Sequence, residues 1–255
     1  MGLTDASSAS FTVPIDVYGM NVRDINIVEA AHAVQFDMCF YQQDSLTADE
    51  IASAQAWLAE GVAFAPSRWF FGAWDAPFIA QNGWPGLPTN MPSLWPDGLS
   101  DVQIAAAQDC VNNNATVAEF TPSSPMYGFN NTAQLESYWS EGFEYAQQDQ
   151  RFIDLTSQRN ACIVSKGYAV SVQPGVTVPQ LDISRLSSDE QILAANISVA
   201  QCADDMNYTQ QVVDIVAAYQ MVTISQHEAE LTAIKQSLDD LVAKATGLLK
   251  QYGVM

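Results

Sequence analysis

The fold of this chain is decided by the stretch SDEQILAANISVAQCADDMNYTQQVVDIVAAYQMVTISQHEAELTAIKQSLDDLVAKATGLLKQY, which runs from Ser188 to Tyr252. The stretch contains no proline, and Gly247 is its only glycine. Ser188 precedes two acidic residues and is suited to cap the first turn of a helix. Apolar residues recur at the spacing of one helix face. The pattern predicts a very long C-terminal helix over about 188–252.

A straight helix of that length would measure roughly 90 Å, because each residue adds about 1.5 Å. That length exceeds the diameter expected of a domain of this size. We therefore expect the helix to kink, to pair with another long helix in a coiled-coil-like hairpin, or to project toward a partner or a second copy. A bend at 204–208 is the alternative that requires no partner.

Upstream of this stretch, capping residues predict further helices and thus an all-α, irregular helical fold. Asn21 is suited to cap a helix with Asp24 in its first turn, and Thr47 and Glu50 have capping-box spacing. Ser100 is suited to the same role. Helices are expected over 21–43, 45–61, 99–114 and 131–168, the last as one or two helices. The alternating, proline-containing segment 11–20 is expected to be extended.

An aromatic segment over 62–98 interrupts the helices. It holds four tryptophans, Trp69, Trp74, Trp84 and Trp95, among many prolines and glycines. Such frequent Pro and Gly predict a loop-rich segment rather than a long helix, with one short helix at DAPFIAQNG. The aromatic rings are expected to anchor the segment against helices. The alternative is a stacking wall for a sugar, a peptide or another small ligand.

The chain divides by composition into three parts. The composition of residues 1–10 predicts a disordered linker from which a signal or lipid anchor has been trimmed. The alternative is an ordinary disordered cytosolic terminus. A polar, proline-containing connection through FTPSSPMYGF separates an N-terminal helical half over 11–120 from a C-terminal half over 121–255. No apolar run approaches the roughly 18 residues of a membrane-spanning helix.

The charge balance is strongly acidic. The chain has 9 basic and 29 acidic residues, a formal net charge of −20. Arg23 and Arg68 are the two cations of residues 1–150, against eighteen carboxylates. A negative field of this size repels phosphate backbones and anionic lipid headgroups, so nucleic-acid binding and charge-driven membrane binding are poor hypotheses. Solubility alone explains such a charge.

The four cysteines are isolated from one another and lie in helical segments. With two histidines in the chain, they have no zinc-finger spacing. Two disulfides are expected in an oxidising compartment, and four cysteines allow three connectivities. We favour Cys39 with Cys110 and Cys162 with Cys202, because each pairing joins segments of the same half. Four buried free thiols in a cytosolic protein are the alternative.

The sequence offers no persuasive catalytic centre. His32 and His227 lie on predicted helices rather than in nucleophile loops, where a solvated or core-edge histidine is the more common case. Glu141 and Glu144 share a helix face and could in principle serve as a catalytic carboxylate pair. Two acids on one helix face are more often solvated surface residues. Nucleotide-binding and calcium-binding motifs are missing, so we expect no cofactor, no metal and no enzyme.

Three segments of the C-terminal half are distinctive: ACIVSKGY, ISVAQCADD and VVDIVAAYQ. Together they resemble a family of predicted actinobacterial envelope lipoproteins of unassigned function. The extended VPIDVYGM entry, Cys39 and the RWFFGAWD segment are also similar. The matching residues are Cys162, Gly167, Tyr168, Cys202, Ala218, Tyr219 and Gln220. Ile163 and Ala203 depart from the family's usual methionine and lysine. The resemblance implies an exported, lipid-anchored protein that acts with other envelope components such as an export system, and it supplies no catalytic residues.

We therefore expect an extracytoplasmic, non-enzymatic binding or scaffold protein of the cell envelope, anchored by lipid or secreted. Its long C-terminal helix would contact a protein partner or a second copy. The first alternative is a small-ligand or glycan-binding protein that uses the tryptophan-rich segment. The second and weaker alternative is a hydrolase that uses Glu141 and Glu144.

Overall fold

A computed structural model describes residues 13–60, 76–82, 99–121, 133–171 and 180–255. The chain forms two compact units, and each takes segments from both sides of residue 120. The first unit comprises Met1–Asp16, Ala65–Gly86 and Ser137–His227. The second unit comprises Val17–Phe64, Leu87–Glu136 and Glu228–Met255.

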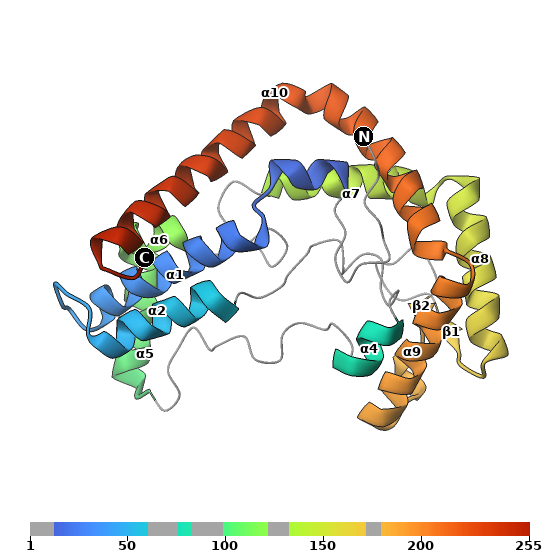
Figure 1. Cartoon of the computed structure of the whole chain (residues 1–255), viewed down its shortest axis with the longest axis horizontal. Coiled ribbons are helices and arrows are strands. Elements are labelled where there is room, and N and C mark those ends of the chain that lie inside the picture. The colour runs from blue at the N-terminus through green and yellow to red at the C-terminus, as the bar shows by residue number, and fades with distance from the viewer. Residues whose placement is uncertain (1–12, 61–75, 83–98, 122–132, 172–179) are drawn as a thin grey trace. The chain divides into compact units, whose positions relative to one another are not determined.

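The described residues are almost entirely helical, which confirms the predicted all-α class (Figure 1). The helices are α1 (Val22–Phe40), α2 (Ala48–Glu60), α4 (Ala76–Asn82), α5 (Asp101–Asn113), α6 (Ala115–Phe120), α7 (Ala133–Gln147), α8 (Gln150–Ser165), α9 (Asp189–Asp205) and α10 (Tyr208–Gln251). Two short 3₁₀ helices, η1 (Pro14–Tyr18) and η2 (Ile183–Arg185), accompany them. The antiparallel strands β1 (Val170–Ser171) and β2 (Gln180–Leu181) pair with each other in the first unit.

The predicted capping residues begin the helices as expected. The Asn21 side chain accepts a hydrogen bond from the backbone N–H of Asp24 at 3.0 Å. At the start of α2, the Thr47 N–H donates to the Glu50 carboxylate at 2.6 Å and the Glu50 N–H donates to the Thr47 hydroxyl at 3.3 Å. Ser100 forms a capping box at the start of α5. Each cap satisfies backbone donors that a helix start leaves unpaired.

Three local expectations need correction or refinement. The extended conformation expected for 11–20 is wrong for its described part, because η1 occupies Pro14–Tyr18. Helix α6 was not predicted; Asn114, expected to end the preceding helix, also caps α6 by accepting from the backbone of Thr116 and Val117. The segment 131–168 holds two helices, and Asp149 caps the second of them.

The C-terminal stretch forms two helices rather than one, and the long C-terminal helix is confirmed as α10. Helix α9 ends at Asp205, and Asn207 has a left-handed φ of 50°, so the chain turns within the segment where a bend was predicted. Asparagine tolerates this conformation better than most residues. A second irregularity, which the pattern did not predict, lies at His227, whose φ of −123° and ψ of 22° are not helical. His227 is also the last residue of the first unit.

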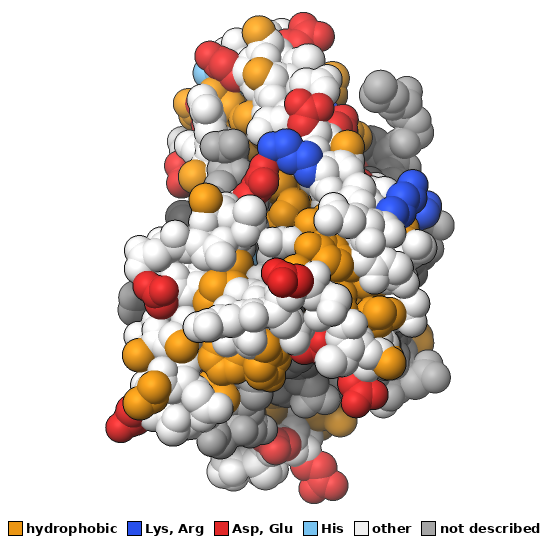
Figure 2. Space-filling model, turned by 90° about the vertical axis from the view of Figure 1, so that its left-hand side faces the viewer, with side chains coloured by type: hydrophobic (Ala, Val, Ile, Leu, Met, Phe, Trp, Pro, Cys, Tyr) orange, Lys and Arg blue, Asp and Glu red, His pale blue; other side chains and the backbone are white. Residues whose placement is uncertain are grey.

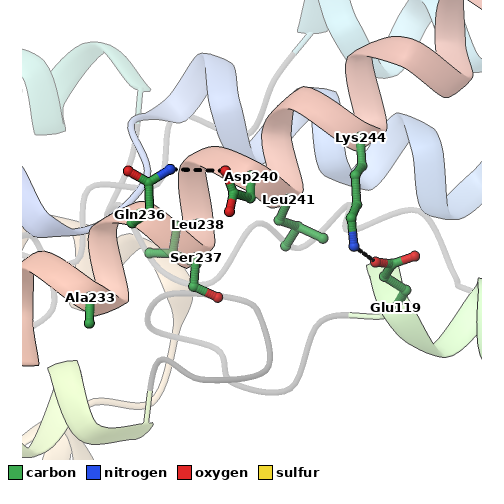
Figure 3. Close-up of a pocket in the computed structure, with 8 residues that line it drawn as sticks. All are labelled: Glu119, Ala233, Gln236, Ser237, Leu238, Asp240, Leu241 and Lys244. Carbon is green, nitrogen blue, oxygen red and sulfur yellow. Dashed lines mark hydrogen bonds and ion pairs between the residues drawn. The ribbon is translucent and has the colours of Figure 1, made fainter.

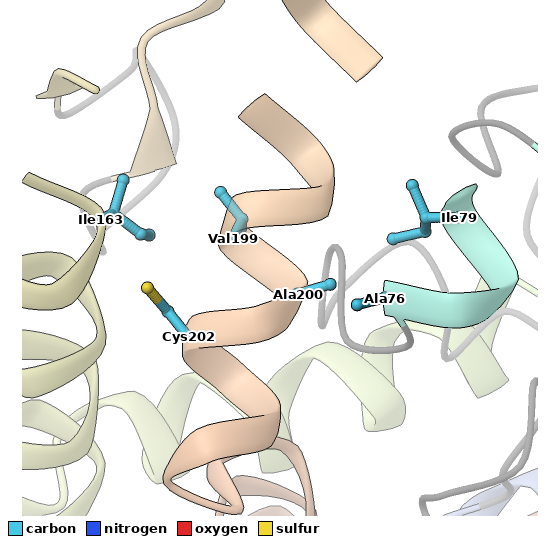
Figure 4. Packing of buried hydrophobic residues seen from close by; sticks show 6 residues of the cluster. All are labelled: Ala76, Ile79, Ile163, Val199, Ala200 and Cys202. Carbon is cyan, nitrogen blue, oxygen red and sulfur yellow. The ribbon is translucent and has the colours of Figure 1, made fainter. Parts of the chain in front are cut away.

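The core of the first unit is built around α9. Figure 4 shows Val199, Ala200 and Cys202 of α9 between Ile163 of α8 and the short helix α4. Small residues on α9, such as the fully buried Ala200, let α4 approach closely. Helix α9 is therefore held on one side by α8 and on the other by α4.

The core of the second unit is centred on α1. This helix packs against α2, α5 and α6, and Phe36 forms a buried cluster with Ala107, Cys110 and Val117. Phe36 also stacks on Phe40 one turn later, with ring centroids 5.6 Å apart. Side chains around most of its circumference are buried, so α1 is an interior helix, unlike an amphipathic surface helix.

Helices α7 and α10 meet closely at Gly142 in the first unit. A Cβ atom placed at Gly142 would lie 2.8 Å from Cγ and 3.3 Å from Cα of Gln220. Gln220 is fully buried, and its side-chain oxygen accepts a hydrogen bond from the Ile15 N–H at 3.4 Å. The absence of a side chain at Gly142 therefore allows the two helices to approach.

We expect Gly142→Ala to destabilise the protein by about 1 to 2 kcal/mol, because overpacking against Gln220 outweighs the gain in helix propensity. Gly247→Ala is the matched control, since Gly247 is also helical but a Cβ there meets nothing within 4 Å. That variant is expected to gain about 0.5 to 1 kcal/mol. Denaturant unfolding of both variants measures the difference, and equal stabilisation by both substitutions would contradict the close contact.

Candidate functional site

The four cysteines form two disulfides in the favoured pairing, which is confirmed. Cys39 at the end of α1 is joined to Cys110 of α5, and Cys162 of α8 is joined to Cys202 of α9. In each pair the Cα atoms lie 5.9 Å apart. No free cysteine remains, so Cys162 is a structural crosslink. Two such crosslinks indicate an oxidising, extracytoplasmic environment.

The other residues singled out in the sequence are four tryptophans and a pair of glutamates. Trp69, Trp74, Trp84 and Trp95 lie outside the described residues, so the ligand-binding wall stays a prediction. Glu141 and Glu144 both belong to α7, one half-buried and the other exposed, and the carboxylate-pair hydrolase likewise stays a prediction. Within the described ranges, no group of three or more His, Cys, Asp or Glu side chains could hold a metal ion.

A row of buried polar side chains on α1 is the clearest unusual feature of the second unit. Asn26, Glu29 and His32 recur every three residues, which places neighbouring members about 5 to 6 Å apart on the helix surface. Asn26 and His32 are each 6% exposed. Among the residues that the structure describes, Asn26 Oδ1, Glu29 Oε2 and His32 Nε2 have no hydrogen-bond partner.

Burial favours the neutral forms of the two titratable members of this row. It raises the pKa of Glu29 to about 7 and lowers the pKa of His32 to about 4, since a charge is poorly solvated inside the protein. The row can exchange hydrogen bonds with internal water or with a polar group. Sequence reasoning expected a solvated or core-edge histidine at His32 and missed Asn26 and Glu29. The sequence signal that could have found them is the presence of polar residues at positions of α1 that the helical pattern assigns to its apolar face.

A pocket of about 570 Å³ lies in the second unit between α6 and the C-terminal part of α10 (Figure 3). Lys244 forms an ion pair with Glu119 at one end. Gln236 donates a hydrogen bond to Asp240 at 2.9 Å, while Leu238 and Leu241 supply the apolar part. Among the described lining residues, Lys244 pairs with Glu119 and the Asp240 carboxylate accepts from the Gln236 amide, so these charged groups are already engaged.

The exposed face of α10 differs in charge between the two parts of the helix. Between 215 and 226 the helix has no acidic or basic residue, although the chain carries a net charge of −20. Ala218, Met221, Val222 and Ser225 recur on the exposed face of this segment, with Met221 49% and Val222 55% exposed. We call these four residues the uncharged α10 face. Beyond His227 the exposed positions of α10 are largely charged or polar.

Figure 2 shows a face of the molecule on which carboxylates lie singly between uncharged side chains, with a few basic groups. Spread carboxylates do not form a cation site, in agreement with the lack of a metal-binding group in the described residues. None of the described helices is both long enough and apolar enough to cross a membrane.

These observations define the chain as an all-α protein of two units, each closed by its own disulfide and both sharing α10. Comparison of the chain with protein-family models, curated proteins and solved structures finds no match.

Proposed function

We propose that the chain is an extracytoplasmic, non-enzymatic binding or scaffold protein that serves as an accessory component of a cell-envelope or export assembly, held there by a lipid anchor or secreted. The observation that carries the proposal is the uncharged α10 face, an exposed and partly apolar surface on a rigid helix. Exposed apolar positions depleted of charge are characteristic of the centre of protein interfaces.

Two further features support this proposal. The disulfides fit a protein that works outside the reducing cytoplasm. The buried side of the same α10 segment, which includes Val213 and Val216, is packed into the first unit, so the exposed side is presented by a fixed helix. A fixed helix face loses little conformational entropy when a partner binds.

Site-specific photocrosslinking in the cell that exports the protein tests this function. A benzoylphenylalanine at Val222 is expected to give a defined adduct with an envelope protein, because the side chain would lie inside the interface. The matched control is the same residue at Ile153, which is 46% exposed on α8 of the same unit. We expect no defined adduct from Ile153.

Three results would contradict the proposal. The first is the absence of an adduct at Val222, and the second is the same adduct from both positions, since a true interface is local. The third is an adduct of twice the protein's own mass, because it would assign the uncharged α10 face to a second copy rather than to an envelope partner.

A further inference from the structure

Arg159 is a buried arginine of the first unit, and no described carboxylate forms an ion pair with it. The side chain of Arg159 on α8 is 8% exposed and its guanidinium lies over the ring of Tyr208, 4.4 Å from the ring centroid. Its Nη2 donates to Asn160 Oδ1 at 3.5 Å, the outer limit of a hydrogen bond. Within the described part of the chain, Nε has no partner and no carboxylate forms an ion pair with Arg159.

This arrangement is unusual in a chain that has 29 acidic residues. A guanidinium offers five N–H donors and stays charged in proteins, so it cannot neutralise itself as a buried lysine or glutamate does. Desolvation lowers the pKa of Arg159, which shows the cost of holding the charge there. Buried charges are ordinarily paired or hydrogen-bonded. Arg159 therefore has unused capacity to bind an anion.

Through its contact with Tyr208, Arg159 lies beside the start of α10. Tyr208, on which the guanidinium stacks, begins α10, and the backbone N–H groups of a first helical turn carry partial positive charge. The next residue, Thr209, is 7% exposed, and its hydroxyl has no partner among the described residues. The Tyr208 hydroxyl is held at 3.0 Å from the Thr156 hydroxyl, which fixes the ring beneath Arg159.

We propose that Arg159 anchors a binding site in the first unit for a small oxyanion, either a phosphate or a carboxylate. The planar fork of a guanidinium matches two oxygen atoms of such a group. Its stacking on Tyr208 leaves the in-plane N–H donors to face the ligand. The Thr209 hydroxyl and the start of α10 supply the remaining donors.

The competing explanation gives Arg159 a packing role only, through its stacking on Tyr208. The two explanations differ in their response to anions. A ligand that binds the folded state alone raises the melting temperature as its concentration rises. A packing contact between Arg159 and Tyr208 does not make the melting temperature depend on the anion concentration.

The test is thermal unfolding of the full chain in a series of inorganic phosphate concentrations, and separately of acetate, with ionic strength kept constant by chloride. Phosphate also stabilises proteins non-specifically, so the informative quantity is the difference between the wild type and Arg159→Gln. We expect the wild type to gain about 3 °C more than Arg159→Gln at ten times the dissociation constant. Arg151→Gln, which removes an exposed arginine, is expected to respond like the wild type.

The two anions distinguish the source of the ligand. A specific response to phosphate alone indicates a tetrahedral oxyanion, and a response to acetate indicates a carboxylate. An equal response of the wild type and Arg159→Gln to both anions overturns the proposal.

A second measurement covers the case in which Arg159→Gln does not fold. The Nε–H resonance of Arg159 in the wild type can be assigned by its proximity to the Tyr208 ring. We expect this resonance to shift in a saturable manner on addition of phosphate or acetate. A resonance that stays unchanged with both anions overturns the proposal.

Discussion

Replacing Cys162 and Cys202 together by alanine is expected to lower the free energy of unfolding of the first unit by about 4 kcal/mol. The two residues are 40 positions apart, and the crosslink removes the entropy of closing that loop in the unfolded chain. Because α8 and α9 also lose their covalent tie beside the buried Cys202, hydrogen exchange is expected to accelerate in those two helices. Mass-spectrometric hydrogen exchange resolves the effect by segment.

The matched control is the double replacement of Cys39 and Cys110, which are 71 positions apart in the second unit. That variant is expected to lose slightly more than 4 kcal/mol, since the loop is longer. Its exchange should accelerate in α1 and α5 while α8 and α9 stay protected. Identical exchange patterns in the two variants would show that the two units unfold as one, against the division described above.

The second large effect is expected at Glu29, where Glu29→Gln should stabilise the protein by about 2 to 3 kcal/mol at a pH of about 8. In the unfolded chain the carboxyl loses its proton near its ordinary pKa of 4.5, whereas burial keeps it protonated in the folded chain up to a pKa of about 7. The folded state therefore binds more protons in this window, and wild-type stability falls as pH rises through it. Glutamine removes that loss.

Denaturant unfolding of the wild type and Glu29→Gln across this pH range measures the difference. The advantage of the variant is expected to be small near pH 4.5, to grow as pH rises and to level off above about pH 7. Glu228→Gln, which changes an exposed glutamate of α10, is the control and should show no such trend. A pH-independent difference at Glu29 would contradict the burial of an ionisable carboxyl there.

Because His32 also changes the pH dependence of stability, the contribution of Glu29 must be measured by comparing the wild type with Glu29→Gln. Its pKa is lowered to about 4, so the folded state keeps it neutral while the unfolded chain protonates it below its ordinary pKa of 6.5. Stability from this residue falls as pH decreases from 6.5 to 4, opposite in sign to the contribution of Glu29. In the wild type the pH dependences of stability from Glu29 and His32 offset each other. The contribution of Glu29 is therefore seen in the difference between the wild type and Glu29→Gln.

Features set by neighbouring residues in the sequence were predictable. The starts of α1, α2, α5 and α9 follow from caps whose hydrogen bonds span three residues, as at Ser188, which accepts from the Gln191 N–H. A bend at 204–208 was one of the alternatives that the sequence left open, because a continuous straight helix there would exceed the size of the domain. The disulfide pairing was favoured among three connectivities, because it joins cysteines within the same half of the chain.

Burial could not be predicted in the same way. Glu29 and Glu228 are both glutamates on helices, yet Glu29 is half-buried on the packed helix α1 and Glu228 is exposed. Burial raises the pKa of Glu29 to about 7. Arg159 likewise has no feature in the sequence that separates it from Arg151. Its burial and its stacking on Tyr208 join residues 49 positions apart in the sequence.

By itself, then, the sequence determined the helical class, most helix starts and the charge of this protein, because hydrogen bonds between near neighbours and composition do not depend on distant packing. It favoured one of three disulfide pairings, and the fold decided the pairing by bringing together cysteines 71 and 40 positions apart. Tertiary structure alone decided how segments interleave into two units, where α10 becomes irregular at His227, and which polar groups lose their water. Those outcomes depend on contacts between residues far apart in the chain, and desolvation, which gives Glu29 and Arg159 their unusual chemistry, arises only when such contacts form.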